Sequence, residues 1–113
     1  KLIIWGDGSP KREVIYVDDI ANACVYFMRK KIKETIINVG TGKDYSIRDY
    51  VKIISSRINP KVKIDIKYDK TKPNGTPRKV LDVSLARKYG WISKTSLEDA
   101  IDRTYLDYLI KNK

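Results

Sequence analysis

The sequence contains no histidine and only one cysteine, Cys24. Histidine is the commonest metal ligand and the usual general base near neutral pH, so its absence excludes a zinc site or a Ser-His-Asp triad within these residues. One cysteine cannot form a disulfide within the chain, which fits a reducing, cytoplasmic setting. Cys24 lies in an apolar helical stretch, where we expect a small core residue and not a nucleophile.

Long apolar runs are also missing. No stretch is long enough to span a bilayer, and Lys1 is not followed by the apolar region and cleavage site of a signal peptide. The chain does not begin with methionine, and its first residues already predict a strand, so we interpret it as a fragment of a longer protein. Its 113 residues, 42% hydrophobic and 34% charged, predict one small domain spanning residues 1–113.

The chain is strongly basic. Lysine and arginine number 24 against 14 acidic residues, and the net charge is +10. This balance favours an anionic partner, which can be a nucleic acid, a membrane surface or a phosphorylated small molecule. The lysines are spread from end to end, as is typical of solvated positions, so we expect no nucleic-acid partner and no membrane partner. A small basic nucleic-acid-binding module remains the alternative from a different class.

Short β-branched and aromatic stretches alternate with stretches of helical periodicity. The former predict strands at residues 2–5, 13–17, 36–39 and 62–68. The latter predict helices at residues 18–31, 47–58 and 85–90, and a last one after Ser96. The predicted fold class is therefore α/β, a small mixed domain of short strands and about four helices.

Aspartate and serine side chains are the expected helix caps. In chain order, the candidates are Asp18 or Asp19, Ser46, Ser84 and Ser96. The first helix also has apolar residues at helical spacing, which predict its inward face. These residues are Ile20, Ala23, Cys24, Phe27 and Met28.

Two cationic points stand beside turns rich in glycine and proline. Trp5 and Arg12 flank the first turn, and Arg78 and Lys79 follow the loop at residues 69–77. An indole can stack on a base or sugar, and a guanidinium is a planar fork for phosphate. The residues therefore suit a nucleoside diphosphate, although ordinary turns carrying solvated cations would have the same pattern.

Other motifs resemble catalytic ones. Gly40-Thr41-Gly42 lacks the third glycine of a dinucleotide fingerprint, because Tyr45 occupies its position, so we interpret it as a tight strand exit. Two Tyr-x-x-x-Lys spacings occur among many tyrosines and lysines, as expected by chance. They are Tyr26 with Lys30 and Tyr68 with Lys72. We predict no catalytic, cofactor-binding or metal-binding residue in this chain.

Several motifs together resemble the GDP-L-fucose synthase family. They are Trp-Gly-x-Gly-x-Pro-x-Arg-Glu from Trp5, Asn-Val-Gly-Thr-Gly ending at Gly42, and Lys-Pro-Asn-Gly-Thr-Pro-Arg-Lys-Val-Leu-Asp-Val-Ser from Lys72. Ser-Ile-Arg-Asp from Ser46 and Ser-Leu-Glu-Asp-Ala-Ile from Ser96 complete the order. The resemblance covers nearly the whole chain. It implies an extended short-chain dehydrogenase/reductase of the NAD-dependent epimerase/dehydratase superfamily.

The resemblance implies that the chain is the C-terminal substrate-binding domain, with the Rossmann domain outside it. The family epimerises and reduces GDP-4-keto-6-deoxy-D-mannose with NADP(H), and the catalytic and cofactor-binding residues lie in that Rossmann domain. By resemblance, Trp5, Arg12 and Lys79 bind the GDP-sugar, with Arg78 adjacent. The parent enzyme would be a homodimer. Val14 and Tyr16 depart from the family pattern, so another nucleotide-sugar epimerase, dehydratase or reductase remains open.

Overall fold

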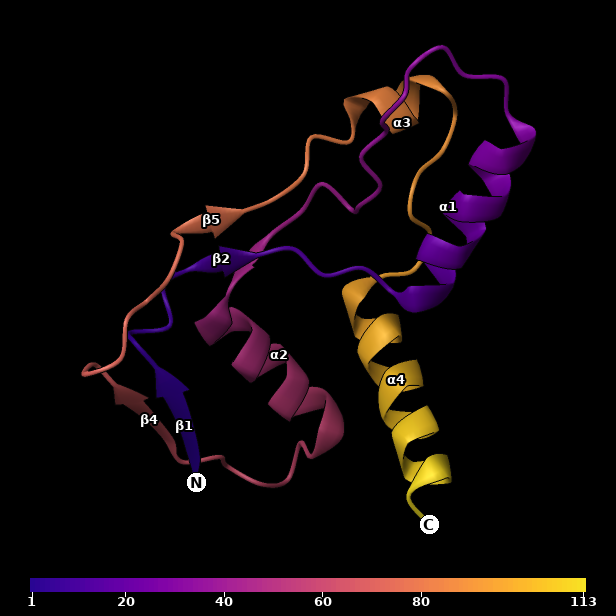
Figure 1. Ribbon diagram of the computed structural model, residues 1–113. Coiled ribbons are helices and arrows are strands. Elements are labelled where there is room, and N and C mark those ends of the chain that lie inside the picture. The colour runs from indigo at the N-terminus through magenta and orange to yellow at the C-terminus, as the bar shows by residue number, and fades with distance from the viewer.

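The computed structural model describes residues 1–113 as five short strands and four helices (Figure 1). The strands are β1 (Leu2–Trp5), β2 (Lys11–Arg12), β3 (Tyr45–Ser46), β4 (Ile66–Asp69) and β5 (Arg78–Lys79). The helices are α1 (Val17–Arg29), α2 (Ile47–Ile58), α3 (Ser84–Lys88) and α4 (Leu97–Lys111). The predicted small mixed α/β domain with four helices is confirmed. None of the helices is long and apolar enough to cross a membrane.

The strands form two separate sheets. β1 pairs in parallel with β4, from Leu2 opposite Ile66 to Trp5 opposite Asp69. β2 lies at the centre of the second sheet, antiparallel to β3 and parallel to β5. Figure 1 shows α2 lying between the β1–β4 pair and α4, with α1 and α3 at the far end of the molecule.

Serine caps start two of the helices as predicted. The Ser46 hydroxyl accepts the Asp49 N–H at 3.0 Å, and the Ser96 hydroxyl accepts the Asp99 N–H at 3.2 Å. Ser46 also donates to the Asp49 carboxylate, which lowers the pKa of that carboxyl. The prediction that Ser84 caps α3 was wrong by one residue, because Ser84 is the first residue of the helix and Val83 is at its N-cap. The Asp82 side chain accepts the Ser84 N–H.

The prediction that Asp18 or Asp19 caps α1 was wrong. The helix begins at Val17, and Tyr16 at its N-cap makes no side-chain cap. Asp19 is buried, with 8% of its surface exposed. Its carboxylate accepts the backbone N–H groups of Lys94 and Thr95 and the Thr95 hydroxyl. Asp19 therefore joins α1 to the segment that leads into α4.

The strand predictions for residues 13–17 and 36–39 were also wrong. Residues 13–16 have no strand ladder, and residues 36–39 pair with no strand. Composition predicted extended backbone there, but a strand also requires a partner. The strand predicted at residues 62–68 is confirmed only from Ile66, where β1 supplies that partner.

The small core lies between α1 and α3. Ala23, Ala86 and Trp91 are buried together, with Phe27 packed against them. The Trp91 indole N–H donates to the Asn22 side chain at 3.0 Å.

The predicted inward face of α1 is only partly correct. Ala23 is buried, whereas Met28 is 85% exposed and Cys24 is exposed, so Cys24 is not a core residue. The covered stripe of α1 is narrower than the apolar stripe in its sequence.

Candidate functional site

Arg12 and Lys79 are brought side by side by the pairing of β2 with β5. They are register partners in this parallel pair, one step after Lys11 opposite Arg78. Partners in a parallel ladder project from the same face, and successive residues alternate between faces. Arg12 and Lys79 therefore share one face of the sheet, whereas Lys11 and Arg78 share the other.

The Arg12 guanidinium is held against the loop at residues 69–77. Its Nη1 donates to the Thr76 carbonyl at 2.7 Å and to the Lys11 carbonyl at 2.6 Å. The Lys11 N–H donates to the Pro77 carbonyl at 2.8 Å, which fixes the same loop to β2. Nε and Nη2 of Arg12 make no hydrogen bond within the protein, so part of the guanidinium fork remains available to an anion.

Arg78 is engaged elsewhere. Its Nε lies 2.5 Å and its Nη2 lies 3.2 Å from the two carboxylate oxygens of Asp44. This bidentate ion pair lowers the pKa of Asp44 and raises that of Arg78. Arg78 therefore projects away from the face shared by Arg12 and Lys79, and although both residues are exposed, only Lys79 makes no ion pair.

Trp5 ends β1, and 68% of its surface is exposed. The Lys72 ammonium lies 5.6 Å from the centroid of the indole ring, a cation–π distance. At the adjoining turn, the Asp7 N–H donates to the Asn74 side chain at 2.8 Å. A Cβ on Gly6 would lie 2.1 Å from that same oxygen, so the close approach of turn and loop requires glycine.

Lys72 and Asn74 were missed as site residues by reasoning from sequence. Lys72 drew notice only for its spacing from Tyr68. The pairing of β1 with β4 places Asp69 opposite Trp5, which brings the following loop onto the indole. These two residues could have been found if the parallel pairing of β1 with β4 had been recognised from the sequence.

The side chains of both Tyr-x-x-x-Lys pairs make contacts within the fold. The Tyr26 hydroxyl donates to the Tyr89 carbonyl at 2.5 Å, and the Lys30 ammonium lies over the Tyr26 ring. Lys72 lies over Trp5, and the Tyr68 ring instead contacts the Arg48 guanidinium. In neither pair does the lysine hydrogen-bond to the tyrosine hydroxyl.

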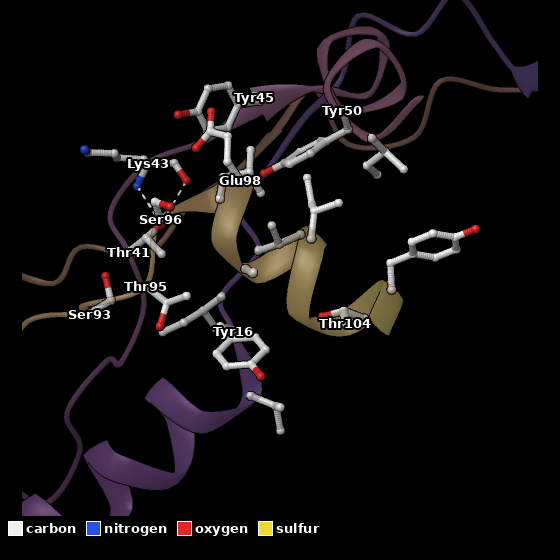
Figure 2. A pocket seen from close by; sticks show the side chains of 18 of the residues that line it. Tyr16, Thr41, Lys43, Tyr45, Tyr50, Ser93, Thr95, Ser96, Glu98 and Thr104 are labelled. Atoms are coloured by element: carbon white, nitrogen blue, oxygen red, sulfur yellow. Dashed lines mark hydrogen bonds between the residues drawn. The ribbon is translucent and has the colours of Figure 1, made fainter. Parts of the chain in front are cut away.

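A cavity of about 940 Å³ lies between α2 and α4 (Figure 2). Its lining is largely apolar and includes Tyr16, Tyr45 and Tyr50. Trp5, Arg12, Arg78 and Lys79 do not line it. Tyr50 links the cavity to β2, because its hydroxyl donates to the Arg12 carbonyl at 2.8 Å, and burial raises the pKa of Tyr50. The cations chosen from sequence therefore lie outside this cavity.

Comparisons with known proteins agree with this fold. Residues 1–40 match the NAD dependent epimerase/dehydratase family. The chain is 38% identical over 112 residues to GDP-L-fucose synthase 1 of Arabidopsis thaliana, covering 99% of this chain and 34% of that protein. It is 39% identical over 111 residues to GDP-L-colitose synthase of Yersinia pseudotuberculosis, covering 97% of this chain and 35% of that protein.

A solved structure has the same fold. The crystal structure of a GDP-6-OMe-4-keto-L-xylo-heptose reductase from C. jejuni superposes with a TM-score of 0.84 at 31% identity. The match covers 97% of this chain and 34% of that one. The chain thus spans about a third of the length of the relatives that it matches.

The fold is that of the C-terminal part of an extended short-chain dehydrogenase/reductase. The chain resembles members of the NAD dependent epimerase/dehydratase family, whose model matches residues 1–40. Within it, the sequence matches the C-terminal part of GDP-L-fucose synthases over nearly all of its residues.

Proposed function

We propose that residues 1–113 form a single nucleotide-sugar-binding domain that holds a GDP-sugar through Trp5, Arg12 and Lys79. The indole would stack on the guanine or ribose, and the two cations would contact the diphosphate. Arg78 would contribute long-range positive charge, because its guanidinium is paired with Asp44. The catalytic and NADP(H)-binding groups would lie in residues outside this chain.

The observation that carries this proposal is the register of Arg12 with Lys79 on one face of the second sheet. Neighbouring strands lie about 4.8 Å apart, so two long cationic side chains on one face can both reach a single diphosphate group. The loop at residues 69–77 joins them to Trp5, because it contacts Arg12 at Thr76 and the indole at Lys72. These contacts support one continuous anion-and-base surface.

For the whole protein, we propose an NADP-dependent epimerase/reductase acting on GDP-4-keto-6-deoxy-D-mannose. The similarity to GDP-L-fucose synthases from plants and bacteria supports this choice. A second candidate is a reductase acting on a different GDP-sugar, which the 31% identity to the C. jejuni heptose reductase favours. Turnover of the two keto-sugars by the full-length protein with NADPH would discriminate between these two substrates.

A titration with GDP tests the binding proposal directly. NMR amide shifts are expected at Trp5, Arg12 and residues 73–79, and not in α4. A nucleic-acid-binding module would instead leave these residues unchanged by GDP and bind oligonucleotides tightly with strong salt dependence. That second outcome would overturn the proposal.

A further inference from the structure

The Glu13 carboxylate joins three segments of the chain next to Arg12 and Lys79. Glu13 follows Arg12 directly, at the end of β2. Its Oε1 accepts the Gly42 N–H at 2.7 Å and the Thr41 hydroxyl at 3.2 Å. Its Oε2 accepts the Leu81 N–H at 2.8 Å. Both oxygens are therefore satisfied by the protein.

These hydrogen bonds hold the residues that follow Arg12 and Lys79 along the chain. Glu13 follows Arg12, and Leu81 lies two residues after Lys79. The Glu13 N–H also donates to the Lys79 carbonyl at 3.2 Å, which is the last hydrogen bond of the pairing between β2 and β5. Strands β2 and β5 are only two residues long, so their own pairing gives little resistance to slippage.

The Gly-Thr-Gly turn is shaped to receive this carboxylate. A Cβ on Gly40 would lie 2.4 Å from Glu13 Oε1, and Gly40 is buried. Gly42 has φ +72°, a conformation that L side chains rarely adopt, and its N–H points at the same oxygen. Both glycines thus make room for the Glu13 carboxylate. This gives the Gly-Thr-Gly motif a role other than dinucleotide binding.

We propose that Glu13 is a positioning residue for phosphate recognition: its carboxylate, held by the Gly40–Gly42 turn and the Leu81 N–H, fixes the register that places Arg12 beside Lys79. The inference rests on the proposed GDP-sugar function. Binding sites are held to within about 0.5 Å by such supporting contacts, and loss of a supporting partner typically weakens a site about tenfold or more.

The substitution Glu13→Gln tests this role, because the loss of negative charge and the loss of strand register predict opposite changes in the affinity for GDP. Removing a negative charge near two cations should tighten binding of an anion. Loss of register should weaken it, because the amide cannot accept N–H bonds on both sides. We expect full-length E13Q to bind GDP about tenfold more weakly and guanosine, which lacks phosphates, as well as wild type. Binding is read from Trp5 fluorescence, and thermal unfolding is measured in parallel.

The matched control is Glu98→Gln, the same chemical change at an exposed glutamate whose carboxylate makes no hydrogen bond. It should leave GDP binding unchanged. Unchanged or tighter GDP binding by E13Q would overturn the positioning role, as would equal weakening for GDP and guanosine, which indicates general damage to the fold. If wild-type protein binds no GDP, the proposed function itself fails and the inference falls with it.

Discussion

Arg12 and Lys79 lie opposite each other in the parallel pairing of β2 with β5, although Arg12 follows the first turn and Lys79 follows the loop at residues 69–77. Each stands one residue from a cation on the other face, Lys11 or Arg78, and Arg78 is held there by Asp44. The structure thus separates four neighbouring cations into two pairs. The loop that reaches Trp5 through Lys72 contacts the Arg12 guanidinium at Thr76.

Alanine substitutions on the two faces of the β2–β5 pair should differ in their effect on GDP binding. We expect Arg12→Ala and Lys79→Ala each to weaken GDP binding about tenfold or more, because each removes a charge-assisted hydrogen bond. Lys11→Ala removes the same charge from the opposite face and should have little effect. Isothermal titration calorimetry with GDP measures the three affinities. Equal losses in all three variants would indicate general electrostatic attraction and contradict a defined phosphate site.

The fluorescence of Trp5 should report on ligand binding without an added label. Its indole is exposed, whereas Trp91, the other tryptophan, is buried with 3% of its surface exposed. Stacking of a base on Trp5 should quench the exposed component of the emission and leave the buried component as an internal reference. Trp5→Ala should abolish the quenching and lose about 1–3 kcal/mol of binding free energy, with Trp5→Phe losing less. Quenching that persists in Trp5→Ala would locate the ligand elsewhere.

The features predicted correctly from sequence depend on local chemistry. The Ser46 and Ser96 caps follow from a side chain and a backbone N–H three residues away, and the structure has both. The α/β class follows from alternating periodicities in the same way. Trp5, Arg12, Arg78 and Lys79 were chosen because each adjoins a turn visible in the sequence, and their role in binding stays a prediction.

Several of the wrong predictions concern partners that lie far away in the sequence. Asp19 has the residue type of a helix cap, but its partners are at residues 94 and 95. Residues 36–39 have strand composition without a neighbouring strand. Arg78 and Lys79 are alike in sequence, and only the pairing of β2 with β5 shows that they face opposite ways. Sheet register is a property of two segments, so one segment alone cannot specify it.

The ion pair between Asp44 and Arg78 should make stability depend on pH in acid. Hydrogen bonding to Arg78 lowers the pKa of Asp44 below its usual value of 3.8. A lowered pKa in the folded state stabilises the fold above the unfolded-state pKa, and this stabilisation is lost as the pH falls through the folded-state pKa. Melting curves between about pH 5 and pH 2 should therefore fall less steeply for Asp44→Asn than for wild type. Carboxyl NMR should show Asp44 titrating below 3.8, and titration at or above that value would contradict the pairing.

Asp19 should contribute far more to stability than its neighbour Asp18. The Asp19 carboxylate is buried and accepts two backbone N–H groups and one hydroxyl from Lys94 and Thr95. Asp19→Ala would leave these donors without partners, at an expected cost of about 2–3 kcal/mol in the free energy of unfolding.

Asp18 is exposed in the first turn of α1 and is the matched control. If Asp18 were the helix cap, Asp18→Ala would cost about 1 kcal/mol, whereas a residue without cap contacts should change stability by less than about 0.5 kcal/mol. Urea unfolding of the two variants, monitored by the buried Trp91, separates the two roles. Near-equal losses would contradict the structure, because they would assign both aspartates to the helix start. A loss confined to Asp19→Ala would identify a tether between α1 and the segment before α4.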